Sequence, residues 1–130
     1  MAIYTSYFSN YRNFPANNVA VSITRFPPKG WKGLEIQSVA PTADKLMRFK
    51  NHEIDENIFS WQYLMQLNKD SNLKPRVQAM LRFLDETYGN VVLCCYETAN
   101  EFCHRHLLAD WLDMNIKEII NEQENKDRCR

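Results

Sequence analysis

Three short apolar runs along the chain predict β-strands. Two of them, Ile3–Phe8 and Val19–Thr24, open the sequence, and the third, Val91–Tyr96, lies much later. All three are rich in β-branched or aromatic residues, which strands favour. The second and third are almost continuously apolar, as in strands of a parallel sheet that is covered on both faces. Residues 34–39 form either a further short strand or an extended approach to Pro41.

Between the second and third runs, apolar residues recur at helical spacing. We expect one helix from Thr42 to about Lys50 with Pro41 in its first turn, where proline is tolerated. A second helix begins after the N-cap residue Asp55, and we expect it to pack on the sheet through Ile58, Trp61, Leu64, Met65 and Leu67. A third runs from Pro75 to Gly89, with an apolar stripe made of Val77, Met80, Leu81 and Leu84.

Two more helices are expected after the last strand. Apolar residues between Phe102 and Leu112 recur at helical spacing, and a short terminal helix is indicated by Ile116, Ile119 and Ile120. The alternation of strands and helices predicts a single compact α/β domain over residues 1–121, with an open, mostly parallel sheet flanked by helices. The charged tail over residues 122–130 is expected to fray.

Composition narrows the functional classes. Sixteen Lys and Arg residues balance sixteen Asp and Glu residues, so net charge does not indicate a nucleic acid as partner. The N-terminus lacks the features of a secretory signal and no apolar stretch is long enough to span a bilayer, which predicts a cytoplasmic protein without a membrane partner. Four cysteines, two of them adjacent, do not form a secreted disulfide framework, so we expect reduced thiols. The sequence has no glycine-rich phosphate loop, and it indicates no cofactor and no particular oligomeric state.

The end of the last strand and the start of the next helix carry the residues with the most chemistry. Ligands of open α/β sheets collect at the carboxyl ends of strands, beside helix N-termini that favour negative charge. Strand alternation places Cys95 and Glu97 on one face and Cys94 on the other. Cys103 lies near the first turn of the helix, where the helix dipole favours a thiolate, and it is therefore the candidate nucleophile.

Two neighbours of Cys103 complete the predicted site. His104 has a reference pKa near neutrality and is suited to be a general base, while Arg105 has a planar fork for phosphate or carboxylate. Together these residues predict a site for a small anionic or nucleotide-like ligand. Residues near neighbouring strand ends would add stacking and charge, namely Arg25, Tyr4 and Trp31.

Plainer interpretations compete with these assignments. Cys94 is expected to be an inert core residue, and Cys95 suits the core as well as the site. Cys103 is equally well explained as a half-buried residue at a helix start. His104 and Arg105 are alternatively an exposed helix face.

A metal site is a further alternative. Four residues carry suitable donor atoms for zinc, namely Cys95, Cys103, His104 and His106. Their spacing lacks a C-x2-C pair, however, and the neighbouring Cys103 and His104 would diverge on a helix, so we predict no metal site. His106 and Cys129 are expected to be structural or exposed.

Several short motifs in the chain resemble a known family. The motifs C-Y-E at 95–97, C-H-R at 103–105 and L-A-D-W-L at 108–112 are similar to the C-terminal signature of domain-of-unknown-function family 488 (DUF488). Its N-terminal strands resemble I-Y-T-S at 3–6 and V-S-I-T-R at 21–25, the latter followed by Pro28 and Trp31, and its mid-chain turn resembles V-A-P-T at 39–42. Tyr63 is the nearest match to a family tyrosine near the end of the middle helix. The resemblance implies a compact Rossmann-like α/β fold and, by analogy only, an enzymatic or nucleotide-related role.

Three hypotheses for the function follow. The first is a small enzyme acting on a phosphate-bearing or nucleotide-like substrate that Arg105 holds. Its catalytic candidates are Cys103, His104, Glu97 and Cys95. The second is a non-catalytic module that binds a nucleotide or a modified base at the same corner. The third is a protein-interaction domain whose Cys-His-Arg corner is closed and whose binding surface is the aromatic loop around Trp31.

Overall fold

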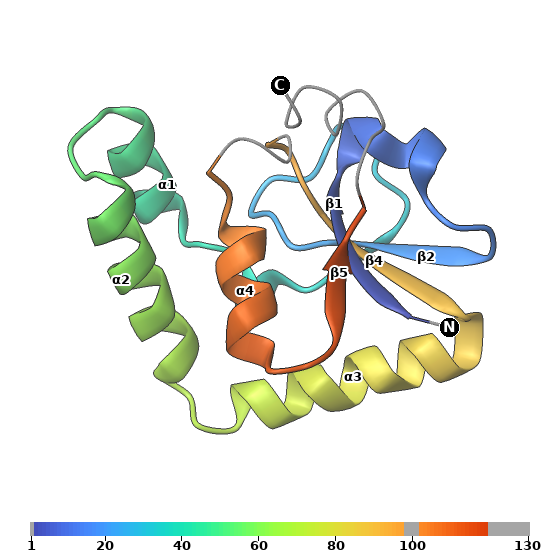
Figure 1. Ribbon diagram of the computed structural model, residues 1–130. Helices are drawn as coiled ribbons and strands as arrows, with labels where there is room; N and C mark the ends of the chain where they lie inside the picture. Colours follow the sequence, from blue (N-terminus) through green and yellow to red (C-terminus); the bar gives the residue numbers. More distant parts are fainter. Residues whose placement is uncertain (1, 98–101, 120–130) are drawn as a thin grey trace, which may run out of the picture.

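The computed structural model describes residues 2–97 and 102–119, and these ranges form a five-stranded, all-parallel sheet with helices packed against it (Figure 1). The strand order is β3-β2-β4-β1-β5. The strands are β1 (Ile3–Tyr7), β2 (Asn18–Ser22), β3 (Leu34–Glu35), β4 (Asn90–Cys95) and β5 (Ile116–Glu118). The helices are α1 (Ala43–Lys50), α2 (Glu56–Asn68), α3 (Leu73–Tyr88) and α4 (His104–Leu112), with 3₁₀ turns η1 (Phe8–Asn13) and η2 (Gln37–Val39). The predicted α/β class with an open parallel sheet is therefore confirmed.

The three strands expected from apolar runs lie together at the centre of the sheet. β4 lies between β1 and β2, with Leu93 opposite Thr5 on one side and Val21 on the other. Of the uncertain stretch over 34–39, only two residues form a strand, and the rest turns into η2 before Pro41. Local apolar runs thus identified the central strands to within a residue or two.

The expected terminal helix around Ile116 is wrong. Residues 116–118 instead form β5, which pairs in parallel with β1 so that Ile3 lies opposite Ile116. The backbone N–H of Ile119 donates to the carbonyl of Thr5 at 2.9 Å. The free edge of β1 offers backbone partners that a short isolated helix would not have, and this long-range pairing overrides the local pattern.

Helix ends follow the expected capping chemistry. Thr42 caps α1 by accepting from the backbone N–H of Lys45, and Asp55 caps α2 by accepting from Ile58 at 2.8 Å. Gly89 ends α3 at φ +105°, a backbone conformation that residues with a Cβ rarely adopt. Pro41 precedes the Thr42 cap and does not occupy the first turn of α1, in contrast to the expectation.

The interior face of α2 also differs from the expected one. Its buried side chains are Phe59, Tyr63 and Leu67. Three residues of the expected stripe are instead 43%, 63% and 54% exposed, namely Ile58, Trp61 and Met65. α2 packs against α1, α3 and α4, and α4 lies between it and the sheet (Figure 1). Because α2 is apolar on two sides, spacing alone did not reveal which side faces inward.

The core is divided by the sheet into two unequal clusters. The larger joins buried side chains of α2, α3 and α4 to alternate residues of β4, namely Val91, Leu93 and Cys95. The smaller, on the opposite face, joins Val92, Cys94 and Ile119 to half-buried Tyr4, Phe8, Phe14 and Ala20. The sheet therefore separates Cys95 from Cys94, as strand alternation predicted.

No helix within the described ranges is long and apolar enough to cross a membrane. The tail expected to fray, including Cys129, lies outside the described residues.

Candidate functional site

The sulfur atoms of Cys95 and Cys103 meet at the carboxyl end of β4, where α4 begins. The structure brings their sulfurs to contact distance, with a Cα–Cα distance of 7.6 Å. This separation is wider than the range of about 4.4–6.8 Å that disulfides usually span, so the sulfur pair does not contradict the expected reduced thiols. Cys95 ends β4 and is 0% exposed, whereas Cys103 is the N-cap residue of α4 and is 2% exposed. Donor atoms of Cys95, Glu97 and Cys103 all lie within 4.8 Å of one another. We call these three residues the thiol–carboxylate cluster.

Arg105 contacts this cluster from the interior of the protein. Its side chain is fully buried, and its Nε and Nη2 donate to the two carboxylate oxygens of Glu118 at 3.0 Å each. Its Nη1 donates to Cys95 Sγ at 2.8 Å and to the backbone carbonyl of Glu97 at 2.5 Å. Four of the five guanidinium N–H groups are thus used within the chain. Arg105 therefore positions the cluster, and its fork is not free for the anionic ligand that we expected it to bind.

Glu118 is a site residue that the sequence analysis missed. It lies on β5, and its Oε1 also accepts from the Thr5 hydroxyl at 2.7 Å. A planar guanidinium facing both carboxylate oxygens is the strongest geometry available to an ion pair. No local signal identifies Glu118, because only the pairing of β5 with β1 brings it to Arg105.

His104 is buried between the cluster and the end of β2. Its Nε2 lies 2.8 Å from the carbonyl oxygen of Ile23, and its Nδ1 lies 3.9 Å from Cys103 Sγ. Burial lowers the pKa of His104 to about 4, so the ring is neutral at pH 7. A carbonyl only accepts, so Nε2 carries the proton and Nδ1 is left as an acceptor facing the sulfur.

Tyr63 fixes the other side of the His104 ring. The two rings meet edge to face with centroids 5.5 Å apart, and the Tyr63 hydroxyl donates to the Val39 carbonyl at 2.6 Å. Burial raises the pKa of Tyr63 far above its usual range, so the phenol stays protonated. The tyrosine matched loosely to the family pattern therefore contacts the candidate site.

A small cavity of about 90 Å³ opens beside His104, at the carboxyl ends of β2 and β4. The lining residues are Thr24, Arg25, Phe26, Pro41, Leu46, Lys50, Tyr96, Glu97 and His104. Two of them, His104 and Glu97, also belong to or contact the thiol–carboxylate cluster. These two side chains thus connect the cavity to the sulfur pair.

The other predicted ligand-binding residues have different positions. Arg25 lines the cavity, but its guanidinium donates to the carbonyls of Gln37, Ala40 and Pro41 and to the Gln37 side chain, so it braces the turn before α1. Tyr4 packs with the small cluster on the opposite face of the sheet. Trp31 packs on Phe8 and donates to the Leu34 carbonyl. The structure therefore does not bring Tyr4 or Trp31 to the cavity, because Tyr4 faces the other side of the sheet and Trp31 lies in the loop between β2 and β3.

Cys94 is the inert core thiol that was expected. It is fully buried in the small cluster, and burial raises its pKa to about 12. It is one residue from Cys95 yet faces the opposite side of the sheet.

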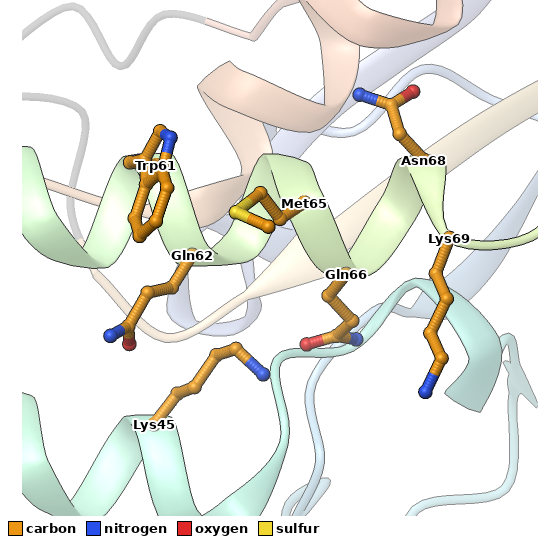
Figure 2. Close-up of a pocket in the computed structure, with 7 residues that line it drawn as sticks. All are labelled: Lys45, Trp61, Gln62, Met65, Gln66, Asn68 and Lys69. Atoms are coloured by element: carbon orange, nitrogen blue, oxygen red, sulfur yellow. The ribbon is translucent and has the colours of Figure 1, made fainter.

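A larger, more open hollow of about 660 Å³ lies on the outer side of α1 and α2 (Figure 2). It is lined by Lys45, Trp61, Gln62, Met65, Gln66, Asn68 and Lys69. None of the predicted site residues lines it, and it contains neither a thiol nor a carboxylate.

Comparison with family models gives a match over residues 4–116 to DUF488-N3a, described as the active DUF488-N3 subclade. The chain belongs to the DUF488 family. The match covers the thiol–carboxylate cluster, His104, Arg105 and the cavity, and it ends two residues before Glu118. Comparisons with curated proteins and with solved structures found no match. Membership in DUF488 therefore agrees with the fold but assigns no reaction.

Proposed function

We propose that this DUF488 protein is a small enzyme that acts on an anion-bearing, nucleotide-type molecule bound in the cavity beside His104. One observation carries the proposal: His104 and Glu97 line the cavity and also contact the buried sulfur pair. A ligand in the cavity would therefore touch side chains that reach the cluster directly. The description of the matched subclade as active is in keeping with retained chemistry.

The size and lining of the cavity favour a compact charged group. A volume of about 90 Å³ corresponds to roughly three water molecules, which suits a phosphate or carboxylate and excludes a whole nucleotide. Lys50 is an exposed cation at the cavity wall. Phe26 and Tyr96 are 63% and 50% exposed beside it, and aromatic faces of this kind stack on planar bases. We infer that the anionic group enters the cavity while the rest of the ligand lies over these rings.

The catalytic groups in this proposal are those that face the cavity and those directly behind them. The ring of His104 lines the cavity, and its tautomer, fixed by the Ile23 carbonyl, leaves Nδ1 as an acceptor that faces Cys103 Sγ. Glu97 supplies a half-buried carboxylate, and Cys95 and Cys103 supply the sulfur atoms. Cys103 does not itself line the cavity, so we place it in the reactive centre without assigning it the nucleophilic attack.

Binding of inorganic phosphate and of adenosine monophosphate tests the proposal. By calorimetry at low salt, Lys50→Ala should weaken binding about fivefold, because an exposed cation contributes roughly 1 kcal/mol. Lys29→Ala is the matched control, since Lys29 is exposed but does not line the cavity. Product analysis after incubation with a panel of nucleotides and phosphate esters then tests turnover. Equal binding by both variants, or no binding by the unaltered protein, would contradict the proposal.

The burial of the corner favours a second candidate function, a protein-interaction domain. Cys95, Cys103, His104 and Arg105 are at most 6% exposed, as expected for a closed structural corner. The protein-interaction function is supported if neither anion binds and no compound in the panel is converted. A non-catalytic binding module gains if the anion binds and no conversion follows.

We also propose that the protein works in the cytoplasm. Thiols are kept reduced there, and only reduced sulfur atoms at positions 95 and 103 are available for chemistry.

A further inference from the structure

Two thiols and a carboxylate converge on one point at the edge of the sheet. Alternation along β4 directs Cys95 and Glu97 to the same side, and the turn into α4 returns Cys103 to them. One donor atom from each lies within 4.8 Å of the other two. Zinc binds sulfur at about 2.3 Å and carboxylate oxygen at about 2.0–2.2 Å, so its donors are roughly 3.5–4 Å apart. Small side-chain rotations would bring the three donors to this spacing.

The backbone separation of the two cysteines suits a shared ion. Their Cα atoms are 7.6 Å apart. Disulfides usually have Cα–Cα distances of about 4.4–6.8 Å. The wider separation leaves space for a third atom between the sulfurs once the pair is reduced.

The charges around the cluster also favour a bound cation. Once both thiols release their protons on metal binding, the three donors and Glu118 carry four negative charges, and Arg105 supplies one positive charge close to them. A divalent cation would reduce the remaining excess from three negative charges to one. The Nη1 of Arg105, which donates to Cys95 Sγ at 2.8 Å, is the kind of outer partner that orients a thiolate ligand.

We propose that reduced Cys95 and Cys103, with Glu97, bind one Zn²⁺ ion. Two thiolates and a carboxylate match the soft and borderline donors that zinc prefers. Three protein ligands leave a fourth position for water or a substrate, as in catalytic zinc sites. This inference deepens the proposed function, because Glu97 also lines the cavity. It replaces the two histidines considered from the sequence with a carboxylate as the third donor.

Titration of reduced, chelator-treated protein with Zn²⁺ under argon tests the site. Competition with a chromophoric chelator should show one ion per chain, and Co²⁺ should give the intense absorption of sulfur-to-cobalt charge transfer. Cys95→Ala and Cys103→Ala should weaken Zn²⁺ binding by roughly 100-fold or more. Cys94→Ala is the matched control, because Cys94 is adjacent, equally buried and on the opposite face. Its affinity should equal that of the unaltered protein.

Equal Zn²⁺ affinity in the unaltered protein and Cys95→Ala would overturn the proposal. If the cysteine variants fail to fold by circular dichroism, the Co²⁺ spectrum of the unaltered protein decides the question, and absence of charge-transfer absorption overturns it. Glu97→Gln should retain that absorption while binding Zn²⁺ more weakly. Phosphate binding that depends on Lys50 is measured separately with a chelator present. Failure of the metal site and failure of the anion site therefore give different results.

Discussion

At the scale of single residues, Arg105 shows how context changes the meaning of a motif. In the sequence, C-H-R presents a guanidinium beside a thiol and an imidazole, which indicates anion binding. In the structure, the guanidinium is buried, forms an ion pair with Glu118 and donates a hydrogen bond to Cys95 Sγ. A charge in the interior is stable only when its hydrogen bonds are satisfied. The donors of Arg105 are therefore used by groups of the protein itself and not by a ligand.

Removal of its partner should therefore be costly. Glu118→Leu leaves the buried Arg105 charge without its carboxylate and should lower the free energy of unfolding by about 3 kcal/mol. Urea denaturation measures the loss. Asp44→Asn, which breaks the exposed pair with Arg48, should change stability by less than about 0.5 kcal/mol. A small effect of Glu118→Leu would show that the pair contributes little to the fold.

His104 predicts the pH dependence of stability. Burial holds its pKa at about 4 in the folded protein, against 6.5 in the unfolded chain. Below pH 6.5 the unfolded state therefore binds more protons, and stability falls as the pH decreases toward 4. The full loss from this group is roughly 3 kcal/mol. It should be visible in urea titrations of metal-free protein at several pH values.

The control for this prediction is His104→Gln, which keeps a donor for the Ile23 carbonyl but cannot titrate. Carboxylates contribute their own acid dependence to both proteins, so the difference between the two curves is the measured quantity. Parallel curves between pH 6.5 and 4 would mean that His104 is not buried in its neutral form.

At the scale of elements, α2 has two apolar sides with different roles. Phe59 is 2% exposed in the core, whereas Trp61, two residues later, is 63% exposed. Phe59→Ala should lower the free energy of unfolding by about 3–5 kcal/mol. Trp61→Ala should change it by less than about 0.5 kcal/mol. Thermal and urea denaturation of both variants measure the difference. A larger loss of stability in Trp61→Ala than in Phe59→Ala would show that the Trp61 side of α2 faces the core.

At the scale of the whole molecule, much of the fold followed from local pattern. The central strands, the Thr42 to Lys50 segment, the Asp55 cap and the stop at Gly89 were all predicted from short stretches of sequence. These features depend on side-chain branching, capping and backbone preference, which act over a few residues. Two of the errors, the face of α2 and the element at 116–118, concern partners that are distant along the chain.

The candidate site was also predicted only in part, and the correct part again depends on neighbouring residues. The sequence located Cys95, Glu97, Cys103 and His104 at one strand end, because alternation and helix position follow from neighbouring residues. It did not reveal that Glu118 would take the Arg105 fork, or that Tyr4 and Trp31 would lie away from the cavity. Those facts depend on which strands pair and in which order.

The sequence by itself thus determined the fold class, the family and the segment that holds the candidate site. Only the tertiary structure decided which side chains face the cavity, which charge is already neutralised and which sulfur has a partner. The physical reason is the range of the interactions involved. Secondary structure arises from contacts between neighbours, whereas burial and ion pairing depend on residues brought together by the completed sheet.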